Sequence, residues 1–237
     1  GGTGASLYVD NLAILNTAAA VSTSYRYDAA GRLAATVDGL GNTETYTYDA
    51  AGRRLSTTDA NGHTSRSIYD AAGRVVYSID ATGGYMRTWY DSVDRVTARR
   101  QFATMATTPA PSDTTTVAQM DAQLVFAAAD IGTVYTVYDS AGRLRYTVRM
   151  TTGSSMSVTD SSYDGAGRLL QQRGYSALMA LDSALSTKLV NGTATDADFA
   201  AFVSANASTA QSARTVYDAA GRATYSIDAT GAFTRNW

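Results

Sequence analysis

The side chains in this sequence that could do chemistry occur mostly in one recurring combination of tyrosine, aspartate and arginine. The phrase Tyr-Asp-x-x-Gly-Arg runs from Tyr27 to Arg32 and again from Tyr48 to Arg53, 21 residues further on. Two aspartates that met across neighbouring strands could act as an acid–base pair. A phrase repeated at a fixed step, however, indicates a building unit rather than a single site.

Six complete copies and one variant of this phrase are present, and successive copies are 21, 21, 21, 48, 25 and 54 residues apart. The variant has Tyr90 and Asp91, with Asp94 where glycine is expected. The complete copies are Tyr27, Asp28, Gly31, Arg32; Tyr48, Asp49, Gly52, Arg53; Tyr69, Asp70, Gly73, Arg74; Tyr138, Asp139, Gly142, Arg143; Tyr163, Asp164, Gly167, Arg168; and Tyr217, Asp218, Gly221, Arg222. We interpret these as structural repeat residues.

The spacing of aspartate and glycine predicts chain reversals. Asp at the first position of a turn accepts backbone N–H bonds, and Gly at the fourth adopts a positive φ without steric cost. A second, weaker Asp-x-x-Gly mark begins at Asp38, Asp59, Asp80 and Asp228. Two turns in each 21-residue unit leave room for two strands of ordinary length.

The segments between the turns, such as "ETYTY", "VVYSI" and "LRYTV", are rich in β-branched and aromatic residues. They predict a mainly β protein of consecutive antiparallel hairpins, each about 21 residues long and stabilised by stacking on its neighbours. We expect the tyrosines to form a ladder in which each ring contacts the ring of the next unit. The arginine could pair with a neighbouring aspartate or lie over a tyrosine face.

The repeated phrase, followed by an apolar residue at Leu33, Val75, Leu144 and Leu169, resembles the YD repeat of Rhs-type proteins. That family includes polymorphic bacterial toxins, shell components of insecticidal toxin complexes, and animal teneurins. The resemblance spans roughly residues 22–100, 134–173 and 214–237. It implies a ribbon of antiparallel strands that spirals into a shell, which encloses a polypeptide or presents an adhesive surface.

The sequence departs from the family's toxins because it has no candidate plug region, autoproteolytic site or variable toxic domain. It also contains a larger repeat: "IYDAAGRVVYSIDATGGYMRTW" at Ile68–Trp89 is nearly copied at Val216–Trp237, 148 residues later. We therefore expect the chain to be a window on a longer array, and one that is extended or self-associating rather than a closed cocoon.

The departures from the 21-residue period predict two helical insertions. In residues 101–133, Asp113 is a candidate N-cap for a stripe of Val117, Met120, Leu124 and Ala128. In residues 174–213, Leu178, Leu181, Leu185 and Leu189 precede Asn191-Gly192, and Thr195 or Asp196 could cap a second short helix with Phe199, Phe202 and Val203. These insertions could pack on the sheet or contact other chains.

The resulting organisation is a terminal strand in residues 1–21, repeats in 22–100, an insertion in 101–133, repeats in 134–173, an insertion in 174–213 and a repeat in 214–237. The phrase "GASLYVDNLAIL" in the first segment resembles the closing strand of a carbohydrate-binding jelly roll. That segment is therefore either the end of a preceding domain or a first edge strand.

Composition excludes several classes of function. Nineteen Lys and Arg against 21 Asp and Glu give a net charge of −2, which favours neither nucleic acid nor an anionic membrane. The chain has no cysteine and no apolar run long enough for a membrane helix. His63, the only histidine, directly follows a turn, where an exposed polar residue is expected. We predict no catalytic residues, cofactor or metal, although repeated Asp-Gly turns leave calcium binding as an alternative.

Two functions from different classes remain. The first is a non-catalytic scaffold in the wall of a hollow shell, tube or filament of a secreted or surface-bound bacterial protein. Its partners would be further repeats of the same or identical chains, with an encapsulated polypeptide as possible cargo. The second is an adhesin-like module that recognises glycan or protein on a cell surface. Tyrosine rings that face inward, with insertions packed on their own chain, would favour the scaffold, and a cluster of exposed aromatics beside an insertion would favour adhesion.

Overall fold

The computed structural model describes residues 22–102, 110–123, 132–151 and 154–236. Within these residues, 16 strands form one antiparallel sheet in which neighbours follow chain order, apart from β13, which pairs with β11. The strands are β1 Ser24–Tyr27, β2 Leu33–Val37, β3 Thr43–Tyr48, β4 Arg54–Thr58, β5 Thr64–Tyr69, β6 Val75–Ile79, β7 Tyr85–Tyr90, β8 Val96–Phe102, β9 Val134–Tyr138, β10 Leu144–Met150, β11 Ser155–Tyr163, β12 Leu169–Gly174, β13 Met179–Ala180, β14 Gln211–Tyr217, β15 Ala223–Ile227 and β16 Phe233–Arg235. The predicted succession of antiparallel hairpins is confirmed.

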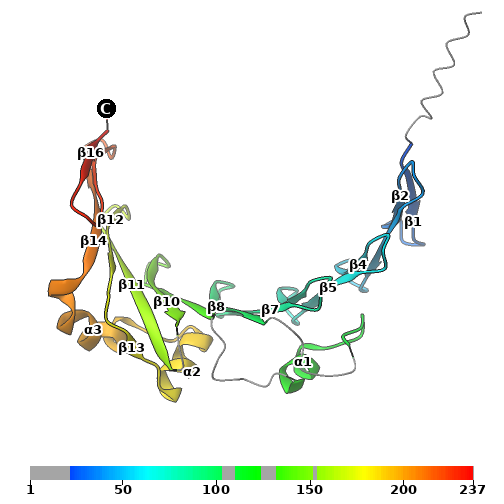
Figure 1. Ribbon diagram of the computed structural model, residues 1–237, viewed down its shortest axis with the longest axis horizontal. Helices are drawn as coiled ribbons and strands as arrows, with labels where there is room; N and C mark the ends of the chain where they lie inside the picture. Colours follow the sequence, from blue (N-terminus) through cyan, green and yellow to red (C-terminus); the bar gives the residue numbers. More distant parts are fainter. Residues whose placement is uncertain (1–21, 103–109, 124–131, 152–153, 237) are drawn as a thin grey trace, which may run out of the picture.

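The sheet is an open arc rather than a closed barrel, and its first and last strands lie far apart (Figure 1). The described ranges contain three α-helices, α1 Val117–Gln123, α2 Ser183–Asn191 and α3 Asp196–Ala205, and a 3₁₀ turn at Ala207–Thr209. All three α-helices lie on the outer, convex side of the arc (Figure 1). The opposite face of the sheet is the concave one.

Alternation along the strands separates these two faces. Tyr77 contacts α1, because its hydroxyl donates to Asp121, so its neighbour Ser78 points to the concave face. Ser78 lies opposite Ser67 and Met86 on the adjacent strands, and Met86 lies opposite Gln101. Directly opposed residues share a face. Three of these four residues are polar, so the concave face is mainly polar along this row.

The larger of two apolar cores lies between the middle of the sheet and the second insertion. Leu189 of α2 and Phe199 of α3 are fully buried against strands β8 to β11. Phe199 stacks on Tyr146 of β10 with 4.3 Å between ring centroids. Leu185 and Val148 complete the contact. The second insertion thus packs on its own sheet, which is one of the two arrangements predicted for it, the other being contact with other chains.

The smaller core lies under α1, where Met120 is buried among Ile68, Tyr77, Tyr85 and Phe102. Tyr85 and Phe102 are stacked with 4.5 Å between their ring centroids. A single antiparallel sheet has no second layer to cover its apolar side chains. Each insertion supplies that cover on the convex face, as a second sheet does in a sandwich.

The helix starts differ in part from prediction. Helix α1 begins at Val117, where Thr116 and Gln119 bond reciprocally, whereas Asp113, the predicted cap, pairs with Arg66. Helix α2 is capped by Asp182 and ends at Asn191, with Gly192 as its C-cap, so Leu178 and Leu181 precede it.

The predicted cap of α3 is confirmed, because Thr195 and Asp198 form a capping box. The expected first strand in residues 1–21, and Leu124 and Ala128 of the expected stripe, lie outside the described residues.

Candidate functional site

The recurring Tyr-Asp-x-x-Gly-Arg residues form the turns at one end of the strands, on the same side of the sheet in every unit. We call this row of turns the YD edge, and the row of turns at the other end of the strands the opposite edge. Each copy is a tight turn between two strands. In the first, Gly31 N–H donates to Asp28 O at 3.0 Å and Asp28 N–H donates to Arg32 O at 2.8 Å. Gly31 has φ +77°, the left-handed conformation that closes a type I turn into a hairpin.

The aspartate side chain holds this turn together. Oδ1 of Asp28 accepts the N–H groups of Ala30 and Arg32, each at 2.9 Å, and Oδ2 accepts Arg32 Nε at 2.7 Å. The backbone N–H of Arg32, followed by its side chain, lowers the pKa of Asp28 below its ordinary value. The same direction holds for Asp49, Asp70, Asp91, Asp139, Asp164 and Asp218 in the other copies.

Each copy is also bonded to the copy before it. The Tyr48 hydroxyl donates to Leu33 O at 2.8 Å, and the Arg32 guanidinium lies 4.8 Å from the centroid of the Tyr48 ring. Arg32 Nη1 also donates to Asp49 O at 2.7 Å. One arginine therefore binds the aspartate of its own turn, the next tyrosine ring and the next turn's backbone. Arg32 therefore makes both of the contacts that the sequence analysis considered for it, the ion pair with an aspartate and the contact with a tyrosine face.

This linkage repeats along the whole described edge. The tyrosine hydroxyl bonds to the preceding unit at Tyr69, Tyr90, Tyr138, Tyr163 and Tyr217. The arginine-over-tyrosine pairs are Arg53–Tyr69, Arg74–Tyr90, Arg95–Tyr138, Arg143–Tyr163 and Arg168–Tyr217, at 4.5–4.7 Å. Our expectation that tyrosine rings contact one another was wrong, because a guanidinium covers the face where the next ring was expected.

The chain continues these links across both insertions. Arg95 pairs with Tyr138, and Tyr217 bonds to Leu169 O although 48 residues separate them in sequence. The first insertion leaves after Phe102 and the second after Gly174, both at the edge opposite the YD turns. The YD edge is therefore uninterrupted from the first described copy to the last.

The variant copy keeps the turn without glycine. Asp94 has φ +65° and is the only described non-glycine residue with positive φ. Aspartate tolerates this conformation better than most residues. Its carboxylate accepts Arg74 Nη1 at 2.7 Å, which adds an ion pair between this unit and the preceding one.

The opposite edge carries the weaker Asp-x-x-Gly turns. Asp38 accepts the N–H groups of Leu40 and Asn42 in the geometry seen at Asp28. The fifth position, which is arginine at the YD edge, is Asn42, His63, Gly84 or Ala232 here. His63 is largely exposed, with Nδ1 3.2 Å from Asp59 Oδ2 in its own turn. These turns have the same local bonds but no side chain that reaches the next unit.

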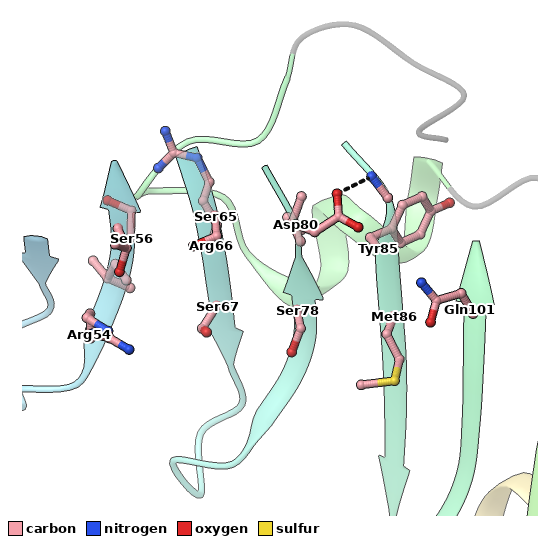
Figure 2. A pocket seen from close by; sticks show the side chains of 14 residues that line it. Arg54, Ser56, Ser65, Arg66, Ser67, Ser78, Asp80, Tyr85, Met86 and Gln101 are labelled. Carbon is pink, nitrogen blue, oxygen red and sulfur yellow. Dashed lines mark hydrogen bonds between the residues drawn. The ribbon is translucent and has the colours of Figure 1, made fainter. Parts of the chain in front are cut away.

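A polar hollow of about 390 Å³ lies on the sheet near this opposite edge (Figure 2). Its lining includes the concave-face row Ser67, Ser78, Met86 and Gln101. Arg54, Arg66 and Asp80 also line it, so the hollow offers hydroxyl, amide and charged groups, and the Asp80 carboxylate accepts the N–H of Gly84. Among the described residues, no group of three or more His, Cys, Asp or Glu side chains could hold a metal ion.

A buried ion network that the sequence reasoning missed fixes the second insertion. Asp160, 1 % exposed, accepts Arg173 Nη2 at 2.6 Å, Arg145 Nη1 at 3.2 Å and the Tyr175 hydroxyl at 3.2 Å. Arg145 also donates to Asp196 at the start of α3, at 2.7 Å. Burial raises the pKa of Tyr175 to about 12, so its hydroxyl stays protonated as a donor. A lone Asp inside the strand pattern "SVTDSSY" was the available signal.

Comparison with known proteins relates these features to a family. Residues 27–64 match the family model of the RHS Repeat. No curated protein matches the chain. The described parts of the chain contain no helix that is long and apolar enough to span a membrane.

Similar folds occur in solved structures of toxin components. The chain matches TcdB2–TccC3 without its hypervariable C-terminal region (19 % identity, TM-score 0.56) and TcdB2–TccC3–Cdc42 (20 %, 0.55). It also matches the Photorhabdus luminescens Tc holotoxin pore with the TccC3 mutation D651A (16 %, 0.54). About 90 % of this chain is covered in each match, against 9 % of the other chain. At these identities the likeness shows the fold.

Proposed function

We propose, from the premise that this chain carries YD/Rhs repeats, that it forms part of the wall of a hollow shell in a large secreted or surface bacterial protein. The observation that carries the proposal is the uninterrupted YD edge on a curved sheet whose described helices all lie on the convex side. Each arginine–tyrosine link joins one unit to the next along the arc. The role is structural and non-catalytic.

The distribution of polar and apolar groups supports a wall rather than an adhesin. Both insertions pack on the convex face of their own sheet, through Met120 and Phe199. The YD tyrosines from Tyr48 onwards are half-buried beneath guanidinium groups. A ligand site built from exposed aromatics beside an insertion would have the opposite arrangement.

Single cysteines test which face is enclosed, because the chain has none of its own. Gln101→Cys places a thiol on the concave face, and Ser183→Cys places one at the start of α2 on the convex face. In the native full-length protein, we expect a small maleimide to label both residues. A bulky polyethylene-glycol maleimide should label only Ser183→Cys. Equal labelling of both by the bulky reagent would overturn the enclosed wall.

Electron microscopy of the same full-length protein supplies the global test. Closed hollow particles are the expected result, in place of the extended array that the missing plug region alone favoured. Open tubes or filaments with a regular axial repeat would instead make the array a scaffold without an enclosed lumen. Compact particles with no cavity would contradict both forms.

A further inference from the structure

Two arginines in the middle of the sheet point to its concave face. Arg99 of β8 follows Ala98, and Arg149 of β10 follows Val148. Both apolar neighbours are buried in the larger core, on the side of the second insertion. Because successive side chains of a strand point to opposite faces, the two arginines point away from that core. Both are exposed on the concave side.

The pairing register brings these two arginines close together. Arg99 and Arg149 are both directly opposite Val134 of β9, which lies between them. Directly opposed residues share a face, and neighbouring strands are about 4.8 Å apart, so the two Cα atoms are roughly 10 Å apart. Ser157 of β11 lies directly opposite Arg149 on its other side and adds a hydroxyl to the row. Both guanidinium groups can therefore reach one ligand that lies over Val134.

The chain supplies no negative charge to this pair. Strands β6 to β12 contain one carboxylate, Asp160, which is opposite Tyr146 on the convex face. Among the described residues, neither Arg99 nor Arg149 takes part in a hydrogen bond, an ion pair or a ring contact. Residues 151–154, between β10 and β11, read TTGS and lack the aspartate of the other turns.

Arginines on the convex face of the same strands are neutralised within the chain. Arg87 pairs with Asp121, and Arg145 and Arg173 pair with Asp160. The convex face thus contains charges that are matched where they lie. The concave face instead presents two neighbouring cations without an anion of their own, beside a row of neutral polar groups.

We infer that Arg99 and Arg149 bind an acidic segment of polypeptide on the concave face, with one carboxylate at each guanidinium and the segment's backbone over Val134. The inference rests on the proposed wall, because the enclosed polypeptide supplies this segment. Guanidinium groups bind carboxylates through two parallel N–H···O bonds. A nucleic acid fits this face poorly, because it binds through many phosphate contacts and these strands place only two arginines here.

Zero-length cross-linking in the native full-length protein locates the acidic segment. Arg99→Lys and Arg149→Lys keep the positive charge and each introduce an amine, where this chain has a single lysine, Lys188. A carbodiimide activates a carboxylate, the amine displaces the activating group to form an amide bond, and the carbodiimide leaves as its urea. Mass spectrometry of the digested protein then identifies the joined peptides. Ser78→Lys is the matched control, because it places an amine on the same face two strands away.

We expect Arg99→Lys and Arg149→Lys to form amide bonds with carboxylates of one short segment outside the repeats. The yield should exceed that of Ser78→Lys about fivefold, the preference that two exposed ion pairs of ordinary strength provide together. A link between Lys188 and Asp198, which form an ion pair on the convex side, should appear in every variant and report an intact fold.

Equal yields from Ser78→Lys, or no link from the two arginine positions, would overturn the inference. Links only to turn aspartates of other repeats would also overturn it, in favour of contact between copies. Either result together with size-selective maleimide labelling would leave the enclosed wall in place without this site. Equal labelling by the bulky maleimide would instead remove the wall itself.

Discussion

The two edges of this sheet are built from the same turn, yet only one of them connects the units. Asp28 at the YD edge and Asp38 at the opposite edge accept the same pair of backbone N–H groups. The difference lies in the fifth residue. Arg32 reaches the next tyrosine and the next turn, whereas Asn42 bonds back to its own aspartate at 2.8 Å.

This difference teaches that turn formation and unit-to-unit linkage are separate properties. Asp-x-x-Gly suffices for a hairpin, and tyrosine with arginine adds the link. Both insertions leave the sheet at the opposite edge, where no described side chain links one turn to the next unit. An insertion at the YD edge would fall inside a turn, between Asp49 and Arg53 for example, and would break the bonds that close that turn.

Acidification should produce the largest effect. The pKa values of the turn aspartates are lowered at both edges; for Asp28 the main cause is the Arg32 N–H, and for Asp80 it is the Thr82 hydroxyl. A carboxyl whose pKa is lower in the folded state stabilises it above the unfolded pKa, and that stability is lost as pH falls through the folded value. We expect denaturant midpoints to fall steeply below about pH 4.

The two edges should respond differently to this acidification, because the tyrosine–carbonyl bonds and arginine–tyrosine contacts do not titrate there. Amide exchange at pH 6 and pH 3 should show the opposite-edge turns opening first. Unchanged stability between these pH values would contradict the role given to the carboxylates. Earlier opening of the YD turns would reverse the comparison.

Gly192→Val should have the largest effect of any single substitution considered. Gly192 ends α2 with φ +70°, and a Cβ there would lie 2.7 Å from Thr97 Cγ2 and 2.9 Å from Asp91 Cβ. Strain and overpacking together should cost about 3 kcal/mol or more. Urea denaturation measures the loss. Gly62→Val is the control, because its Cβ meets nothing within 4 Å and only the backbone strain applies.

Gly52→Val and Gly62→Val form a matched pair at the two edges. Both glycines have φ above +80° and open space around them, so each substitution should cost roughly 1–3 kcal/mol of turn strain. The effect of Gly52→Val should extend to the next hairpin, because Arg53 loses its place over Tyr69. Peptide-resolved amide exchange should confine the effect of Gly62→Val to its own hairpin. Uniform loss of protection along the chain in either variant would contradict a modular ribbon.

The smallest difference separates Arg53→Gln from His63→Gln, which alter the same position of a turn at opposite edges. Arg53→Gln removes the guanidinium that lies over the Tyr69 ring, and this cation–π interaction should stabilise the fold by about 0.5–1 kcal/mol. His63→Gln should change stability by less than about 0.5 kcal/mol, as is usual for exposed positions. Thermal unfolding of the two variants gives the comparison. Equal midpoints would mean that the arginine adds nothing beyond its own turn.

The repeat phrase predicted the hairpins because each of its residues acts locally. Asp28 and Gly31 form a turn through bonds within five residues, so the periodic sequence was enough to predict the turn. The helix caps Asp182 and Thr195 are similarly local, although only Thr195 was predicted. The positions of most turns and strands therefore followed from sequence.

The partners across units did not follow, because they depend on which side chain fills the space above a ring. A tyrosine period fits ring-on-ring contact as well as an intervening guanidinium. Only the twist and spacing of the folded strands places Arg32 over Tyr48. Asp160 was missed for a related reason: its partners Arg145, Arg173 and Tyr175 lie 13 to 15 residues away in sequence and reach it only in the folded sheet.

The link from each tyrosine to the unit before it also bears on how such a chain acquires its fold. Tyr48 needs only a carbonyl made 15 residues earlier, so each emerging hairpin finds its partner already in place. Bridging an insertion costs more loop-closure entropy, which grows only with the logarithm of loop length: lengthening a connection from 4 to about 36 residues adds about 2 kcal/mol. We therefore expect the hairpins to fold in the order of synthesis, each one pairing with the hairpin before it. Folding should pause briefly where α1 and α2 must form.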